Sequence, residues 1–268
     1  MTTTAIVLAA GASQRMGRPK LLLPHRSTTL LGATVAAVAA SAVDRVIIVA
    51  GAETAAAASA LTDHRVSAVE NPEPARGNMS SLATAIDTDS HTTFFVLVAA
   101  DLPTIAPAAI DAVTAVARTE HAWAVVTTYR DRIAHPFVLS RAAVDELGHL
   151  EGSKVLWKVL VEERDPRVRR VSFDADAPID VNTPADYAAL TGRRHALAHS
   201  SGTAGLMAAF FSLDLEPGDE ILVPTATFWA SVLPMLWFGL VPVFCESEAE
   251  RLGPCPVDME ARITPRTR

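Results

Sequence analysis

The chain reads Leu8-Ala9-Ala10-Gly11-Ala12-Ser13-Gln14-Arg15-Met16-Gly17-Arg18-Pro19-Lys20 directly after its first apolar run, residues 4–8. That run is short and rich in aliphatic residues, which predicts a buried strand, so the small residues after it form the loop at its carboxyl end. Small residues let backbone N–H groups approach phosphate oxygens. Arg15 and Lys20 would neutralise a triphosphate and the charge that develops on departing pyrophosphate. The loop is a candidate triphosphate cradle; the alternative is an ordinary turn.

Strands and helices alternate outward from this loop. The order predicts an α/β fold with a Rossmann-like, mostly parallel sheet, whose ligands belong at the carboxyl ends of the strands. A strand at residues 168–173 and a helix after Pro184 continue the pattern. The expected strands are residues 4–8, 45–49, 66–69, 94–99 and 124–128, and the expected helices are residues 29–41, 52–61, 80–86, 107–119, 141–147 and 155–162.

A second candidate feature is Asp101, which follows the apolar run at residues 96–100. A buried strand there would deliver this carboxylate to the same edge of the sheet as the loop. Mg²⁺ requires oxygen ligands and usually takes only one or two from the protein. The alternative is that Asp101 caps the helix near Pro107, but it lies several residues too early. The sequence therefore predicts a metal ligand at Asp101.

The string L-A-A-G-x-S-x-R-M-G-x-P-K-L-L-L-P, residues 8–24, resembles the signature of the nucleotidyltransferases that include molybdenum-cofactor cytidylyltransferase. The resemblance implies a nucleotidyltransferase domain over residues 1–191, with Arg15, Lys20 and Asp101 catalytic. In this family Ala-Ala-Gly, here Ala9-Ala10-Gly11, accompanies cytidine use. The residues that the resemblance assigns to nucleotide binding are Leu8, Ala9, Ala10, Gly11, Ser13, Arg15, Lys20, Gly77, Ser80 and Ser81.

Three further segments carry the resemblance with departures. The segment at residues 180–186 looks like the family's late D-[IV]-D-T-P-E-D, which implies metal ligation by Asn182, an uncharged replacement, or by Asp180. Thr183 before a proline is also a sound helix start. In the loop at residues 71–82, Ser80 could instead cap a helix. The sequence Ala134-His135-Pro136 resembles the family's acceptor loop G-H-P, so His135 is the expected acceptor contact, unless it is an ordinary surface histidine.

The resemblance implies a Mg²⁺- or Mn²⁺-dependent transfer of CMP from CTP to a phosphorylated small molecule such as a molybdopterin-type cofactor, with release of pyrophosphate. That activity belongs to molybdenum cofactor biosynthesis. One alternative is a sugar-nucleotide pyrophosphorylase, which shares the loop chemistry. Another is a nucleotide-binding module without turnover, because Asn182 and Ala134 depart from the family pattern.

Residues 192–268 form a second, partial α/β segment. From residue 195 onward it resembles the start of the DegT-type sugar aminotransferases, which implies that Ser201, Gly202 and Thr203 match a pyridoxal-phosphate phosphate site and that Phe228 or Trp229 matches a ring-stacking residue. The lysines of the chain are Lys20, Lys154 and Lys158. Because the Schiff base needs a lysine, no covalent pyridoxal phosphate is expected in this incomplete segment. Its apolar surface favours self-association.

Composition limits the remaining classes. A net charge of −7 argues against nucleic acid as a partner. Two cysteines and an N-terminus without signal-peptide character suit a cytoplasmic protein. Residues 221–245 carry no charge and are long enough to span a bilayer, but Pro224, Pro234, Gly239 and Pro242 divide them into a strand, a helix and a strand. We therefore expect no membrane span.

Overall fold

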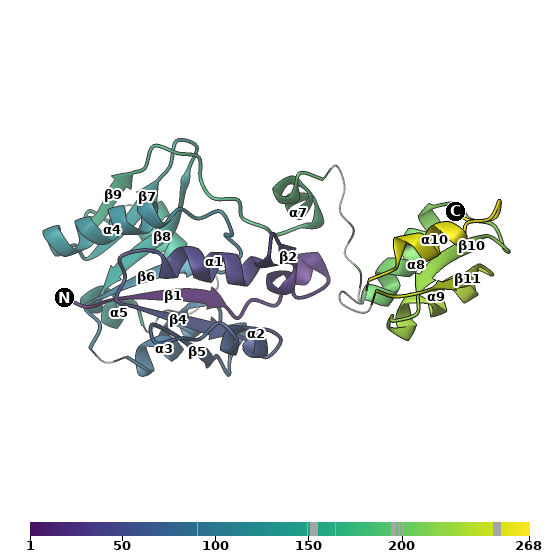
Figure 1. Ribbon diagram of the computed structural model, residues 1–268. Helices are drawn as coiled ribbons and strands as arrows, with labels where there is room; N and C mark the ends of the chain where they lie inside the picture. Colours follow the sequence, from purple (N-terminus) through teal and green to yellow (C-terminus); the bar gives the residue numbers. More distant parts are fainter. Residues whose placement is uncertain are drawn as a thin grey trace. The chain divides into compact units, whose positions relative to one another are not determined.

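The computed structural model describes residues 1–89, 91–148, 150, 155–163, 165–193, 197, 199, 201–248 and 253–268 (Figure 1). Lys154 lies outside the described residues. The chain divides into two compact units, residues 1–196 and 197–268. This division falls five residues after the sequence-based boundary between residues 191 and 192.

The first unit is built on a seven-stranded sheet with the order β5-β4-β1-β6-β8-β7-β9. Its strands are β1 (Thr3–Ala9), β4 (Arg45–Ala50), β5 (Val66–Glu70), β6 (Phe94–Ala99), β7 (Ala124–Thr128), β8 (Ile133–Ser140) and β9 (Val168–Ser172). Only β8 runs against its neighbours, and every other adjacent pair in this sheet is parallel. The predicted α/β fold with a mostly parallel sheet is confirmed.

Helices cover both faces of this sheet, which explains why its central strands are apolar throughout rather than alternating. On one face, Ala5 and Val7 of β1 pack with α1 (Leu30–Ala39), α2 (Ala55–Ser59) and α4 (Pro107–Glu120). On the other face, Ile6 packs with the remaining core helices. These are α3 (Asn78–Asp87), α5 (Arg141–Leu147) and α6 (Val155–Trp157), which continues as the π-helix η4 (Lys158–Glu162). In Figure 1, α1 and α3 lie on opposite sides of β1.

The order in which the chain adds strands to the sheet determines where a ligand site is expected. From β1 the chain adds β4 and β5 on one side, then returns to add β6 on the other side of β1. The carboxyl ends of β1 and β6 therefore flank a topological switch point, where open α/β sheets bind their ligands. The loop after β1 contains the short 3-10 helices η1 (Gln14–Met16) and η2 (Lys20–Leu22) and is followed by the hairpin of β2 (Pro24–His25) and β3 (Thr28–Thr29).

The prediction of a loop at residues 134–137 is wrong, because these residues lie within β8. Phe137 pairs with Val126 and Ala134 with Thr127, so His135 and Pro136 form a bulge in the ladder. A bulge leaves residues without ladder partners, which suits a proline that has no N–H to donate. The Thr127 hydroxyl donates instead to the Pro136 carbonyl at 2.7 Å. The peptide bond between His135 and Pro136 is cis.

The second unit contains a parallel pair of strands, β10 (Glu220–Pro224) and β11 (Val241–Cys245). The connection between them holds η5 (Trp229–Ser231) and α9 (Leu233–Trp237), as the prolines predict. Its small core contains Val223, Met235 and Leu240. Helices α8 (Gly202–Ser212) and α10 (Pro256–Ala261) complete the unit. Within the described residues, no helix is both long and apolar enough to cross a membrane.

Candidate active site

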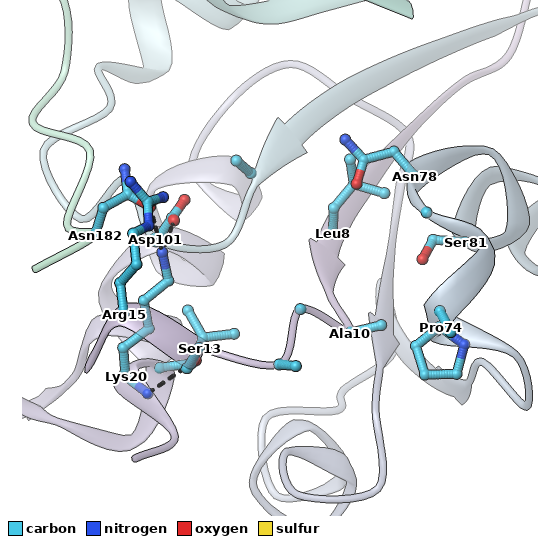
Figure 2. Close-up of a pocket in the computed structure, with 16 residues that line it drawn as sticks. Leu8, Ala10, Ser13, Arg15, Lys20, Pro74, Asn78, Ser81, Asp101 and Asn182 are labelled. Carbon is cyan, nitrogen blue, oxygen red and sulfur yellow. Dashed lines mark hydrogen bonds and ion pairs between the residues drawn. The ribbon is translucent and has the colours of Figure 1, made fainter. Parts of the chain in front are cut away.

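A cavity of about 730 Å³ opens at the carboxyl ends of β1 and β6. Its walls come from four separate segments: the loop after β1, the segment around η3 (Pro74–Arg76), the end of β6, and Asn182 before α7 (Pro184–Thr191). The lining residues are Leu8, Ala10, Gly11, Ala12, Ser13, Arg15, Lys20, Leu21, Pro74, Ala75, Gly77, Asn78, Ser81, Ala99, Asp101 and Asn182 (Figure 2).

The loop after β1 is held by its own hydrogen bonds. Ser13 adopts φ 48°, in the left-handed region that few residues with side chains enter. This conformation accompanies two contacts: the Ser13 carbonyl accepts from Met16 N at 2.9 Å, and its hydroxyl accepts from Lys20 N at 3.2 Å. A Cβ placed on Gly11 meets no atom within 4 Å. The packing of the protein does not itself require glycine there, and the open space faces the cavity where a ligand would approach.

One end of the cavity holds a cluster of two cationic side chains, Arg15 and Lys20, and two oxygen-bearing side chains, Asp101 and Asn182. The Lys20 ammonium forms an ion pair with Asp101 and donates to Asn182 Oδ1 at 3.0 Å. Arg15 Nη2 donates to the same Asn182 oxygen at 2.8 Å. Figure 2 shows Arg15, Lys20, Asp101 and Asn182 converging on one point. The Asn182 oxygen thus already serves as a ligand for positive charge.

Asp180 stands beside this cluster. Partial desolvation raises the pKa of Asp180, and the neighbouring Asp101 carboxylate raises it further, while Asn182 and Lys20 oppose the shift. Asp101 does not cap α4, because the residue before that helix is Ala106 and no side chain caps it. Thr183 and Asp186 form a capping box at the start of α7. Thr183 therefore caps the start of α7, as one interpretation of the sequence predicts. Asn182, one residue earlier, lines the cavity.

The donor set of Asp101, Asp180 and Asn182 fits a hard divalent cation. Its members offer oxygen atoms only, and a positively charged group, the Lys20 ammonium, already sits against two of them. In the part of the chain that the structure describes, no three or more His, Cys, Asp or Glu side chains gather as a metal site. Mg²⁺ usually takes only one or two protein carboxylates and completes its shell with phosphate and water.

The other end of the cavity is formed by the segment after β5. Gly77 has φ 90°, and it turns the chain so that Asn78 and Ser81 face the cavity at the start of α3. Buried Asn71 fixes this segment: Nδ2 donates to the hydroxyls of Ser80 and Ser81 at 2.8 and 3.0 Å. Sequence reasoning missed both asparagines. The available sequence signal for Asn78 is a polar residue that directly follows a glycine, just before the predicted helix at residues 80–86.

Asn78 and Leu8 also line a second cavity of about 280 Å³, so the two cavities adjoin. The other residues around it are His135, Phe137, Leu156, Trp157 and Glu162. His135 stacks on Phe137 with ring centroids 4.5 Å apart. Its Nδ1 lies 3.0 Å from the Leu97 carbonyl. Burial lowers the pKa of His135, which favours the neutral ring. Because a carbonyl oxygen can only accept, the neutral form that fits the Leu97 contact carries its proton on Nδ1 and keeps a lone pair on Nε2.

Most of the residues assigned from the sequence meet at the larger cavity, namely Leu8, Ala10, Gly11, Ser13, Arg15, Lys20, Gly77, Ser81, Asp101 and Asn182. Four others do not line it. The side chain of Ala9 is buried in the core. The Ser80 hydroxyl lies within hydrogen-bond distance of the Glu73 and Gly77 carbonyls, at 2.9 and 3.0 Å. Asp180 stands next to Asp101, and His135 belongs to the adjoining cavity.

In the second unit, Ser201 immediately precedes α8 and its hydroxyl accepts from Ala204 N at 3.1 Å. Gly202 and Thr203 form the first turn of this helix. Phe228 and Trp229 stand 67% and 61% exposed, with ring centroids 5.2 Å apart. The structure thus places Ser201 as a helix cap and leaves the two aromatic rings on the surface of the unit.

Comparison with known proteins identifies relatives for each unit. Residues 5–170 match the MobA-like NTP transferase domain, and residues 184–268 match the DegT/DnrJ/EryC1/StrS aminotransferase family. The structure is similar to that of Rv0371c from Mycobacterium tuberculosis H37Rv, with a TM-score of 0.62 and 35% identity, covering 72% of this chain and 98% of that one. It is also similar to Rv0371c in complex with manganese, with a TM-score of 0.59 and 33% identity, covering 71% and 97%.

A curated relative matches part of the chain. The UDP-N-acetyl-3-dehydro-alpha-D-glucosamine 3-aminotransferase of Acidithiobacillus ferrooxidans is 40% identical over 84 residues, which are 31% of this chain. The chain spans about a quarter, 23%, of the length of that relative.

Proposed function

The chain belongs to the MobA-like NTP transferase family through residues 5–170, and on that premise we propose that its first unit transfers CMP from CTP to a phosphorylated small molecule, with Mg²⁺ or Mn²⁺ as cofactor. The observation that carries the proposal is the meeting of the loop after β1 with Asp101 in one cavity. The loop offers backbone N–H groups and two cations, and Asp101 and Asn182 at the same end of the cavity offer oxygen ligands. That combination suits a metal-bound triphosphate and few other ligands.

The proposed reaction is an in-line displacement. A phosphate oxygen of the acceptor attacks the α-phosphorus of CTP, the bond from the α-phosphorus to the bridging oxygen breaks, and pyrophosphate leaves. Arg15 and Lys20 lie where they can stabilise the charge that builds on the leaving group. Asn78 and Ser81 contact the nucleotide at the other end of the cavity. Positioning and electrostatics suffice for phosphoryl-type transfer, so no protein nucleophile is needed.

A divalent cation would be held by Asp101, with Asp180 or Asn182 as the second protein ligand. When bound, it supplies Lewis-acid stabilisation of the phosphate oxygens. Support comes from the oxygen-only donor set and from Rv0371c, a relative with 33% identity that has been solved in complex with manganese. The uncharged Asn182 lowers the negative charge of the set, and Asp180 offsets that loss when it is ionised.

The acceptor is proposed to occupy the cavity that adjoins the nucleotide cavity at Leu8 and Asn78. His135, Phe137 and Trp157 give it aromatic walls, which suit a flat ring such as that of a molybdopterin-type cofactor. The free lone pair on His135 Nε2 can accept a hydrogen bond from the ring of the acceptor. The acceptor phosphate would then point across Asn78 toward the α-phosphorus.

A second candidate acceptor is a sugar phosphate. The observation that favours it is the match of residues 184–268 to the DegT/DnrJ/EryC1/StrS aminotransferases, because the curated relative is named for a nucleotide-linked sugar.

For the second unit itself we propose no aminotransferase chemistry, since residues 192–268 contain no lysine. Its exposed aromatic residues, Phe211, Phe228, Trp229 and Trp237, suit self-association. Its two free cysteines suit the cytoplasm.

The test is a screen of pyrophosphate release with the four nucleoside triphosphates against molybdopterin-type and sugar-phosphate acceptors, each with Mg²⁺ and with Mn²⁺. We expect release only when CTP and an acceptor are both present, and only with a metal. Release with sugar phosphates alone would favour the second candidate. Specific binding of a triphosphate without release for any acceptor would favour a nucleotide-binding module without turnover.

A further inference from the structure

We infer that the Lys20 ammonium occupies the cation position between Asp101 and Asn182 until a triphosphate draws it away, so that divalent metal and triphosphate bind cooperatively rather than independently. The inference rests on the proposed function, because it assigns these oxygens to a metal. It goes beyond that function by giving Lys20 two successive partners. The position between the oxygens of Asp101 and Asn182 is called the cation seat below.

The geometry of Lys20 carries the first step. Its ammonium contacts both Asp101 and Asn182, and the side chains of Lys20 and Asp101 are each only 14% exposed. A divalent cation bound to the same two oxygens would need the same space. Its charge would also repel the ammonium at a few ångströms, where water screens charges poorly. The metal therefore cannot enter the seat while Lys20 remains in it.

The backbone of Lys20 stays fixed whichever partner its ammonium has. Lys20 N donates to the Ser13 hydroxyl, and the Lys20 carbonyl accepts from Leu23 N at 3.0 Å, so the start of η2 is anchored on both sides. The lysine stem has four rotatable bonds and carries a compact charge that can be re-aimed without moving the backbone. Because Lys20 also lines the cavity next to Gly11 and Ser13, a triphosphate lying on that loop is within the range of the stem.

The coupling follows from the partners available in each state. Without a triphosphate, a metal that displaces the ammonium takes away its two oxygen acceptors, and no acceptor of equal strength replaces them. The loss of these two contacts weakens metal binding. With a triphosphate, phosphate oxygens replace Asp101 and Asn182 as acceptors, and the penalty disappears. Each ligand therefore raises the affinity for the other by the same factor, as linkage requires.

Arg15 provides a matched control within the same cluster. It carries the same charge and contacts the same Asn182 oxygen, but no contact with Asp101 is found for it in the described structure. Removing Arg15 therefore lowers the local positive charge without emptying the seat. Lys158 serves as a remote control, since it is an exposed lysine whose ammonium lies 3.7 Å from Glu163.

The experiment measures Mn²⁺ binding to the full chain without nucleotide, from the loss of the electron paramagnetic resonance signal of free Mn²⁺. Lys20→Met is expected to bind Mn²⁺ at least about tenfold more tightly than the wild type, within the usual range of coupling factors. Arg15→Met is expected to change the affinity less than about threefold, and Lys158→Met not at all. Circular dichroism checks that each variant folds, with Lys20→Gln as a replacement should Lys20→Met not fold.

A second arm measures CTP affinity by calorimetry in EDTA and in Mn²⁺. The ratio of the two dissociation constants is expected to be smaller in Lys20→Met than in the wild type; chelation of Mn²⁺ by CTP in solution is identical for both and cancels. Equal Mn²⁺ affinity in the wild type and Lys20→Met would overturn the inference and leave the proposed function standing. An equal gain in Arg15→Met would also overturn it, in favour of a general charge effect. Tight Mn²⁺ binding by the double variant Lys20→Met with Asp101→Asn would place the metal elsewhere and refute both the inference and the proposed metal site.

Discussion

Replacing Asp101 with alanine is expected to abolish metal-dependent turnover while leaving the fold intact. The stability cost can be worked from its contacts. The change removes the ion pair with Lys20, a charged hydrogen bond worth about 2 kcal/mol in a mostly buried setting. Removal of its carboxylate also relieves the repulsion that raises the pKa of Asp180. For a unit of this size, about 2 kcal/mol lowers the melting temperature by about 4–8 °C. The Asp101 carbonyl, which accepts from Val181 N at 3.2 Å, is unaffected.

The catalytic cost is expected to be far larger. In the proposed metal site Asp101, shortly after β6, is the principal cation ligand, so its loss would remove the cation that neutralises the phosphates. We expect kcat/KM to fall by at least about three powers of ten, or about 4 kcal/mol. Asn182→Ala removes an uncharged ligand and is expected to cost only about tenfold, or about 1.4 kcal/mol.

The assay is continuous pyrophosphate release with the nucleotide and acceptor found by the screen, over a range of Mn²⁺ concentrations. Thermal unfolding of each variant gives the matching stability. The assignment would be refuted if Asp101→Ala kept wild-type turnover with the same metal dependence. Equal losses in Asp101→Ala and Asn182→Ala would refute the reasoning that charge separates the two ligands.

Four further outcomes are expected. Calorimetry with Mg²⁺ should rank CTP first among the four triphosphates, and a clear preference for GTP would contradict the inference from Ala9-Ala10-Gly11. Addition of pyridoxal phosphate should give no borohydride-reducible adduct that maps to residues 192–268, as peptide mass spectrometry would reveal. Truncation after Thr191 should preserve CTP binding and improve solubility, and loss of binding would show that the second unit contributes to the site. Burial lowers the pKa of His135 in the folded chain. As the pH falls through the ordinary histidine value of about 6.5, the unfolded chain therefore binds a proton at this residue before the folded chain does. The free energy of unfolding from urea titrations should fall between about pH 7 and pH 5, and His135→Gln should reduce that fall.

The parts of the site that lie directly after strands could be predicted from the sequence. The loop from Leu8 to Lys20 and the carboxylate of Asp101 each follow an apolar run, and parallel strands bring such positions to one edge. The start of α7 could also be predicted, because Thr183, Pro184 and Asp186 form a local capping pattern. In each case the signal and the structure that it specifies lie within a few residues of one another.

Features that depend on contacts between distant segments could not be predicted. The resemblance to the family's acceptor loop suggested a loop at His135 and Pro136, but these residues lie in β8, which pairs with β6 and β7, and a bulge accommodates the proline. Asn78 lines both cavities because of the positive φ of Gly77 and the packing of α3. The pairing of Lys20 with Asp101 requires two loops to converge, and neither local sequence specifies the other.

The position of Asn182 has a consequence for how the unit holds together. Lys20 and Asn182 are 162 residues apart in the chain, yet they share one hydrogen bond at one end of the cavity. A ligand that contacts both the loop after β1 and the segment before α7 would connect two segments that are separated in sequence by nearly the whole first unit. Such a ligand binds only where every intervening strand is already in place, so it stabilises the complete fold and no part of it alone. Occupancy of the cavity would thereby report that the first unit is folded.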